Sequence, residues 1–229
     1  MNEKSIEAAR SADTVSQSNA TAYTYLVLTA FLWAVGIVLS KGLHETVPPL
    51  GMTFWRWFGA SVILYPFVAG QVRRDWPMIR RNIWRFAILG FVIVGASAVL
   101  VFALRFTTAI NGALLNSSQP ALTVVVAWLA FRSRVSALHI AGLVAAMAGI
   151  VVMVSRADLS TLLSFDFNRG DLLILVATVG YSVYGISISR AKFGVSPWTT
   201  LFAINLFGGL SILPFYIAET IFFQPVPFT

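Results

Sequence analysis

The stretch Phe102–Trp128, "FALRFTTAINGALLNSSQPALTVVVAW", is apolar enough along most of its length to lie in a lipid bilayer. Its middle, however, carries amides and hydroxyls ahead of a proline: Asn111, Asn116, Ser117, Ser118, Gln119 and Pro120. Unpaired amides are costly in hydrocarbon, and a proline removes one backbone donor from a helix. We therefore expect this polar run to face protein or water and never lipid.

Composition places the whole chain, and not only this stretch, in a membrane. Of its 229 residues, 58% are hydrophobic and 11% are charged, and the mean hydropathy is +0.80. A soluble domain carries about 25% charged residues, so this chain lacks the polar surface that water requires. The net charge is +7, and almost all charged residues lie between the apolar runs. Basic residues in such positions indicate membrane topology signals rather than a nucleic-acid partner.

Several chemical classes lack the residues that they need. The chain has no cysteine, and its two histidines, His44 and His139, are far apart in the sequence, so we expect no metal site. It has no glycine-rich phosphate loop with Lys-Ser/Thr, so we expect no ATP-driven mechanism. We also expect no cofactor. No Ser/His/Asp set or carboxylate pair occurs at membrane depth, so we do not expect an enzyme.

Apolar runs of the length that spans a membrane, about 20 residues, recur along the chain. We expect seven transmembrane helices, at residues 23–43, 51–70, 84–104, 110–131, 135–155, 171–189 and 198–218. Prolines and glycines, among them Pro77, mark the connections between them. Residues 1–22 are polar and without periodicity, and we expect a disordered tail there. The predicted fold class is an all-α polytopic membrane protein.

The direction of the helices follows from the basic residues. The strongest cluster lies between the second and third spans: Arg73, Arg74, Arg80, Arg81 and Arg85. With that connection in the cytoplasm, 11 of the 16 Lys and Arg residues lie inside, four lie outside, and Arg56 lies within a span. This asymmetry predicts a cytoplasmic N-terminus and, with seven spans, a C-terminus on the outside.

An internal repeat relates the first two spans to the last two. A shift of 148 residues places Pro49 on Pro197, Phe54 on Phe202 and Pro66 on Pro214. We interpret residues 23–156 as a five-helix repeat and residues 171–218 as two helices of a second copy. Because five is an odd number, the second copy is inverted, which is a common transporter architecture. Three helices of that copy are absent from the sequence.

Three motifs resemble the EamA family of the drug/metabolite transporter superfamily. They are "AFLWAVGIVLSKGL", "FALRFTTAINGALLNSSQPALTVVVAW" and "RVSALHIAGLVAAMAGIVVMV", and "TFWRW" resembles an Arg-Phe of the same family. The resemblance covers about residues 25–218. It implies an inner-membrane protein of ten helices that exports or exchanges amino acids, other metabolites or drugs by alternating access. Where the family often has Gly-Glu-Arg, this chain has Arg132, Ser133 and Arg134, which removes the acidic member.

Two interpretations apply to the candidate site residues. In the first, a polar cavity for a substrate is lined by Asn116, Ser117 and Gln119, with a helix break at Pro120. In the second, these side chains form hydrogen bonds between helices and act as structural glue. The resemblance favours the cavity. The aromatic residues Trp33, Tyr181 and Tyr184 stack on the substrate or pack in the core. Arg56 lies near the end of its span, and we favour a structural role for it.

Two functions of different classes remain open at this point. The first is a transporter of small-molecule substrates in the lipid bilayer; with no carboxylate in the middle of a span, exchange without ion coupling is the simpler mechanism. The second is a truncated, non-transporting membrane protein that acts as a partner subunit or is a defective fragment. Because three helices are absent, transport would need a homodimer or a complementing polypeptide.

Overall fold

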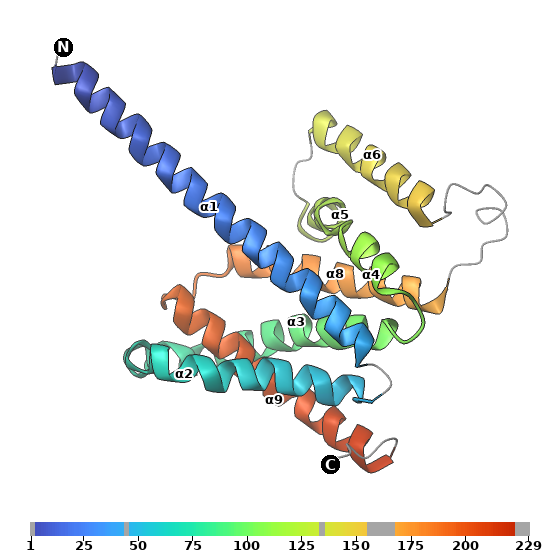
Figure 1. Ribbon diagram of the computed structural model, residues 1–229. Helices are drawn as coiled ribbons and strands as arrows, with labels where there is room; N and C mark the ends of the chain where they lie inside the picture. Colours follow the sequence, from blue (N-terminus) through green and yellow to red (C-terminus); the bar gives the residue numbers. More distant parts are fainter. Residues whose placement is uncertain (1–2, 44–45, 133–135, 155–167, 223–229) are drawn as a thin grey trace. The chain divides into compact units, whose positions relative to one another are not determined.

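The apolar runs form helices in the computed structural model, which describes residues 3–43, 46–132, 136–154 and 168–222 (Figure 1). The helices are α1 (Glu3–Gly42), α2 (Pro49–Arg81), α3 (Ile83–Ala103), α4 (Ala109–Asn116), α5 (Gln119–Phe131), α6 (Ala137–Val154), α8 (Arg169–Arg190) and α9 (Pro197–Phe222). The described residues contain no strand, which confirms the all-α prediction. They form two units, one up to Leu39 and one from Ser40 onward, and the helix break and the pocket described below belong to the second unit.

The number of membrane spans is only partly reproduced. In the described residues, four helices are long and apolar enough to cross a membrane: Thr21–Gly42, Ile83–Ala103, Arg169–Arg190 and Pro197–Phe222. A fifth span results if the bent pair Ala109–Asn116 and Gln119–Ala130 crosses as one. The expected spans at 51–70 and 135–155 fall on α2 and α6, so the count of seven stays a prediction.

The start of the first helix differs from the sequence expectation. We expect a disordered tail over residues 1–22, whereas α1 already begins at Glu3. Residues 3–22 contain no proline or glycine and several strong helix formers, including alanine, glutamate, lysine and arginine. A helix that already exists extends into such a segment without a new nucleation step.

The second helix also runs further than expected. The sequence predicts a stop at Pro77, but α2 continues through it to Arg81. Along this extension Val68, Val72, Asp75 and Ile79 are buried at helical spacing. Packing of this face outweighs the local cost of a proline within the helix.

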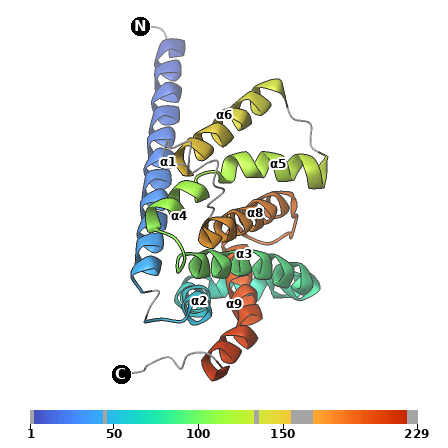
Figure 2. The same ribbon diagram turned by 90° about the vertical axis from the view of Figure 1, so that its right-hand side faces the viewer.

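The second unit is built on α3, α8 and α9. α3 packs against both α8 and α9, α9 also packs against α2, and Figure 2 shows α6, α5, α8 and α3 in successive layers. The backbones of α3 and α9 meet at two glycines: a Cβ atom on Gly90 would lie 2.6 Å from the backbone nitrogen of Gly208. Small residues of this kind let membrane helices approach closely.

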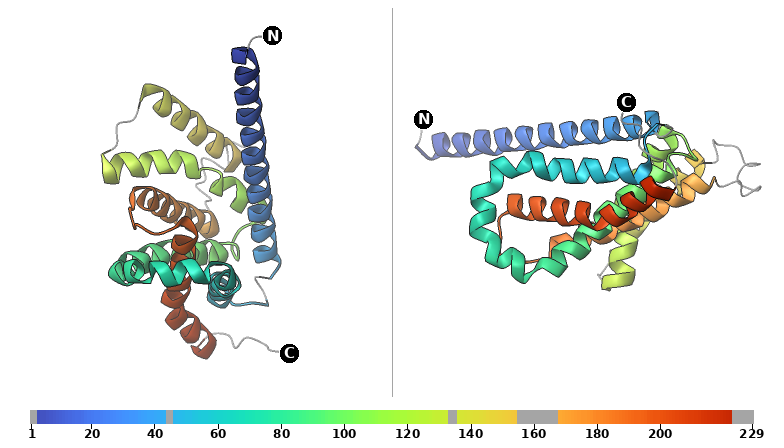
Figure 3. Two further views of the ribbon diagram at one scale, coloured as in Figure 1. Left: turned by 90° about the vertical axis from the view of Figure 1, so that its left-hand side faces the viewer. Right: turned by 90° about the horizontal axis from the view of Figure 1, so that it is seen from below.

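Two carboxylates tie α2 and α9 together at opposite ends. Asp75, late in α2, accepts hydrogen bonds from the Ser196 N–H (3.1 Å) and the Thr199 hydroxyl (2.8 Å), at the start of α9. Glu219, late in α9, accepts from the N–H groups of Leu50 (2.9 Å) and Gly51 (3.0 Å), at the start of α2. The two helices therefore run antiparallel, and each supplies a carboxylate to the other's N-terminus (Figure 3).

Candidate functional site

The polar run of the sequence forms a break between α4 and α5. α4 ends at Asn116, α5 begins at Gln119, and their axes are bent by 44°. Ser117 and Ser118 complete the end of α4, because their hydroxyls donate to the carbonyl oxygens of Leu114 (2.6 Å) and Leu115 (2.5 Å). Pro120 lies in the first turn of α5, where its missing N–H removes no helical hydrogen bond.

Asn116 is the most unusual side chain at this break. It is 9% exposed, and its Oδ1 atom has no hydrogen-bond partner among the described residues. An unpaired buried amide oxygen costs about 1–3 kcal/mol, so native proteins rarely keep one without a use. Gln119, on the other side of the break, is half-buried, and Ser117 is exposed.

The break lies against α8. The Thr123 hydroxyl, one turn into α5, lies 2.9 Å from the Ser182 hydroxyl of α8. Ser182 is 1% exposed and donates to the carbonyl of Thr178 within its own helix. Hydroxyl pairs of this kind hold membrane helices together, so the structural-glue interpretation applies to Thr123 and Ser182.

The two candidate tyrosines of α8 have different surroundings, and Trp33 belongs to the other unit. Tyr181 is 4% exposed and is hydrogen-bonded to Ser97 of α3. Tyr184, one turn further along α8, is half-buried and lines a separate pocket. Trp33 is 44% exposed and belongs to the unit that ends at Leu39.

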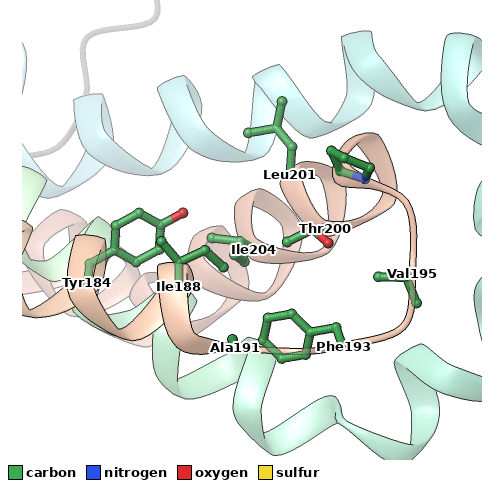
Figure 4. A pocket seen from close by; sticks show the side chains of 9 residues that line it. Tyr184, Ile188, Ala191, Phe193, Val195, Thr200, Leu201 and Ile204 are labelled. Atoms are coloured by element: carbon green, nitrogen blue, oxygen red, sulfur yellow. The ribbon is translucent and has the colours of Figure 1, made fainter.

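The pocket that Tyr184 lines has a volume of about 380 Å³ and lies between the end of α8 and the start of α9. Figure 4 shows Tyr184 and Ile188 on α8, Thr200 and Ile204 on α9, and Phe193 on the connecting segment. The ring of Phe193 stacks on Phe86 of α3 with centroids 4.3 Å apart. This pocket combines an apolar wall with two hydroxyl groups.

Sequence reasoning missed the polar network next to this pocket. Asp75 and Gln71 of α2 bind the segment before α9, since the Ser196 hydroxyl lies 2.6 Å from Gln71 Oε1 and the Ser196 N–H donates to Asp75. The hydrogen bonds from Ser196 and then Thr199 lower the pKa of Asp75 below its usual value, although burial opposes them. Ser196 followed by Pro197 is a helix-start signal that can be recognised in the sequence. Asp75 has no such signal, because it lies in an arginine-rich segment that is typical of a loop.

The chain is similar to proteins that are named as transporters. The model of a family described as the EamA-like transporter family matches residues 20–155. The chain is 22% identical to YyaM, an uncharacterized transporter of Bacillus subtilis, over 82% of this chain and 63% of that protein. It is 27% identical to an uncharacterized transporter of Archaeoglobus fulgidus, over 92% of this chain and 71% of that protein.

A mammalian relative resembles a smaller part of the chain. Solute carrier family 35 member F2 of Mus musculus is 26% identical over 57% of this chain and 36% of its own length. The chain thus spans between about a third and 71% of these relatives. No solved structure matches it.

Proposed function

The chain belongs to the EamA-like transporter family, and from this premise we propose that it carries small solutes across the inner membrane by alternating access. The proposed substrate site is the break between α4 and α5, with Asn116, Ser117 and Gln119 as its polar groups. Amino acids, other small metabolites and drugs are the proposed substrate classes. The N-terminus is proposed to be cytoplasmic.

One observation carries this assignment: Asn116 is buried at a helix break, and its Oδ1 atom has no partner in the part of the chain that the structure describes. Broken membrane helices commonly form transporter sites, because their free backbone groups and polar side chains can bind a solute within the membrane. An N–H or O–H group of the bound solute would donate a hydrogen bond to the Asn116 Oδ1 atom. Before the solute binds, a water molecule would do so. Ser118 differs from Asn116, because its hydroxyl is already bonded to Leu115.

The α2–α9 pair supports an inverted repeat with copies at 23–156 and 171–218. Pro49 and Pro197 each begin a helix, and Pro66 and Pro214 each lie inside one, so prolines related by the 148-residue shift occupy equivalent places. The antiparallel course of the two helices is what an inverted pair requires. In a transporter, such symmetry relates the two halves that alternating access moves against each other, and here a homodimer or a complementing polypeptide would complete the second half.

Flux through proteoliposomes tests the proposal. The 229-residue chain would be reconstituted and loaded with a panel of labelled amino acids, small neutral metabolites and drugs. We expect saturable uptake of at least one compound. We expect Asn116→Ala to lower the kcat/KM for transport of that compound about threefold to tenfold, because the hydrogen bond between the solute and Asn116 contributes about 0.5–1.5 kcal/mol.

Asn111→Ala is the matched control, because it removes the same amide from the same helix at a half-buried position five residues away. It should leave flux near the wild-type value. Absence of saturable flux for the whole panel would contradict the proposed transport. Equal losses in the two variants would contradict the role of Asn116 alone.

A further inference from the structure

We propose that the pocket between α8 and α9 binds an uncharged, largely apolar solute that carries an aromatic ring and one hydrogen-bond donor. This pocket is distinct from the break at Asn116, because Tyr184 lines it while Ser182, two residues earlier, faces α5. The inference rests on the proposed function in one respect, namely that the bound solute is one that the protein carries. Binding and flux are therefore measured separately below.

The charge of the solute follows from the lining, because the described residues that form it include no charged side chain. The neighbouring basic residues, Arg190 and Lys192, are exposed and are not part of the lining. The nearby carboxylate of Asp75 is already bound by Ser196 and Thr199. A charged solute would lose its hydration without gaining a counter-charge, whereas a neutral one would lose little.

The shape of the solute follows from the apolar wall. A volume of about 380 Å³ is near the lower end of small-molecule pockets, which favours a compound of one or two rings. Phe193 is 5% exposed and is held by its stacking on Phe86, with the ring planes 23° apart. A fixed aromatic ring beside the aliphatic side chains of Ile188 and Ile204 suits a flat ring better than a flexible chain.

The hydrogen-bond donor follows from Thr200. Its hydroxyl donates to the carbonyl of Ser196 (3.0 Å), so its oxygen is left to accept from a solute N–H or O–H. Tyr184, on the opposite helix, offers a hydroxyl at the other side of the pocket (Figure 4). Two polar groups in an apolar lining are the usual means by which such pockets orient a ligand.

The wall of the pocket is held in place from α2. Val195 and Pro197 line the pocket on either side of Ser196, whose N–H is bound by Asp75 and whose hydroxyl is close to Gln71. The connecting segment is therefore tied down at its centre before a solute arrives. Binding to such a preformed wall requires less ordering than binding to a free loop.

A series of indoles tests the proposal on the purified full-length chain in nanodiscs. Indole is uncharged, indole-3-acetate is an anion and tryptamine is a cation at pH 7, and all three contain the same fused ring system. Saturation-transfer NMR would measure their dissociation constants. We expect indole to bind at least about tenfold more tightly than either charged analogue, which corresponds to about 1.4 kcal/mol.

Variants separate binding in the pocket from partitioning into lipid. Ala191→Phe adds a ring at a half-buried lining position and should abolish saturable indole binding. Ala130→Phe makes the same change at an exposed position of α5 and should leave binding unchanged. Thr200→Val should weaken the binding of indole about twofold to tenfold. It should not change the binding of 1-methylindole, which has no N–H to donate.

Equal binding of indole to wild type and Ala191→Phe would overturn the proposal, as would charged analogues that bind as tightly as indole. If Thr200→Val weakened the binding of 1-methylindole as much as that of indole, this would overturn the hydrogen-bond assignment. Saturable flux of other solutes together with any of these results would leave the proposed transport standing. Indole binding without flux would support this site and contradict transport of that solute.

Discussion

Polar residues at membrane depth divide into those that bond within their own helix and those that do not. The hydroxyls of Ser117, Ser118 and Thr123 each donate a hydrogen bond to the backbone carbonyl oxygen of a residue three or four positions earlier. Their polarity is neutralised locally and requires no ligand. The Oδ1 atom of Asn116 cannot do the same, because an amide oxygen is an acceptor and a carbonyl oxygen offers it no proton; it has no partner among the described residues.

Solvent access at the break distinguishes a cavity from structural glue. Single cysteines at Asn116, Ser117, Ser118 and Gln119 are expected to react with a small charged maleimide, since the chain has no cysteine of its own. A thiol that faces lipid does not meet a charged reagent. Added substrate should slow the reaction.

Leu129→Cys is the control that should stay unreactive, because Leu129 is a 66% exposed apolar residue on α5. Lys192→Cys, in the connection between α8 and α9, should react and report on the reagent. Four unreactive cysteines at the break, beside a reactive control at 192, would return these residues to a structural role.

The position of the break could be predicted from the sequence, but its bonding could not. Adjacent amides, hydroxyls and a proline indicate a helix interruption in any context. Which of them remains unpaired depends on the rotation of α4 and on the surface of α8 that it meets. Tyr181 and Tyr184 show the same limit: three positions apart on one helix, they contact α3 and the α8–α9 pocket respectively.

At the scale of elements, α3 and α9 depend on a close backbone contact. Gly90→Ala would place a Cβ atom 2.6 Å from the backbone nitrogen of Gly208 and 2.8 Å from the carbonyl oxygen of Ile204. Backbone atoms cannot move aside as a side chain can, so the helices must separate. We expect a loss of about 1–3 kcal/mol, measured as a lower melting temperature of the protein in detergent.

Gly95→Ala provides the contrast on the same helix. A Cβ atom there would meet nothing within 4 Å, so the change should be neutral or stabilise by up to about 1 kcal/mol. The opposite order of the two variants would mean that α3 and α9 do not pack as described.

The Asp75 contact between α2 and α9 should depend on pH. Hydrogen bonds favour the charged carboxylate in the folded protein and lower its pKa, so its contribution to stability is present above about pH 4, the usual value for an aspartate. That contribution is lost as the pH falls through the lower pKa of the folded state. Asp75→Asn should therefore melt below wild type at pH 7, and the difference should shrink below about pH 4.

Arg74→Gln is the control for this measurement. Arg74 lies 3.3 Å from Asp75, but its side chain is 71% exposed, so water screens the pair. Its loss should cost less than about 1 kcal/mol at any pH. A difference between wild type and Asp75→Asn that stays constant from pH 7 to pH 3 would contradict the role of the charge.

Helix existence could be predicted from the apolar runs, whereas helix length could not in every case. α3, α8 and α9 begin and end within a few residues of the expected spans. α2 exceeds its expected span because the face formed by Val72, Asp75 and Ile79 is buried by contacts with distant parts of the chain. A local signal such as Pro77 carries no information about such a face.

At the scale of the second unit, the connections separate into two groups. One group contains the α2–α3 and α8–α9 connections, which the Asp75–Ser196 bond and the Phe86–Phe193 stacking bring together. The other contains the ends joined by the bonds from Lys41 to the Leu104 carbonyl and from Thr107 to Asp171. This division matches the alternation that the basic residues predict, and the direction of the two groups across the membrane follows from where those residues concentrate.

Labelling of single cysteines determines that direction. Asn82→Cys and Ser189→Cys lie in the first group, and Thr46→Cys and Thr108→Cys lie in the second. Because arginines and lysines concentrate beside the first group, we expect it to be cytoplasmic. In intact cells, an impermeant maleimide should label positions 46 and 108 alone, and permeabilised cells should show all four. Labelling of 82 and 189 in intact cells would reverse the orientation, and labelling of one position from each group would contradict the predicted spans.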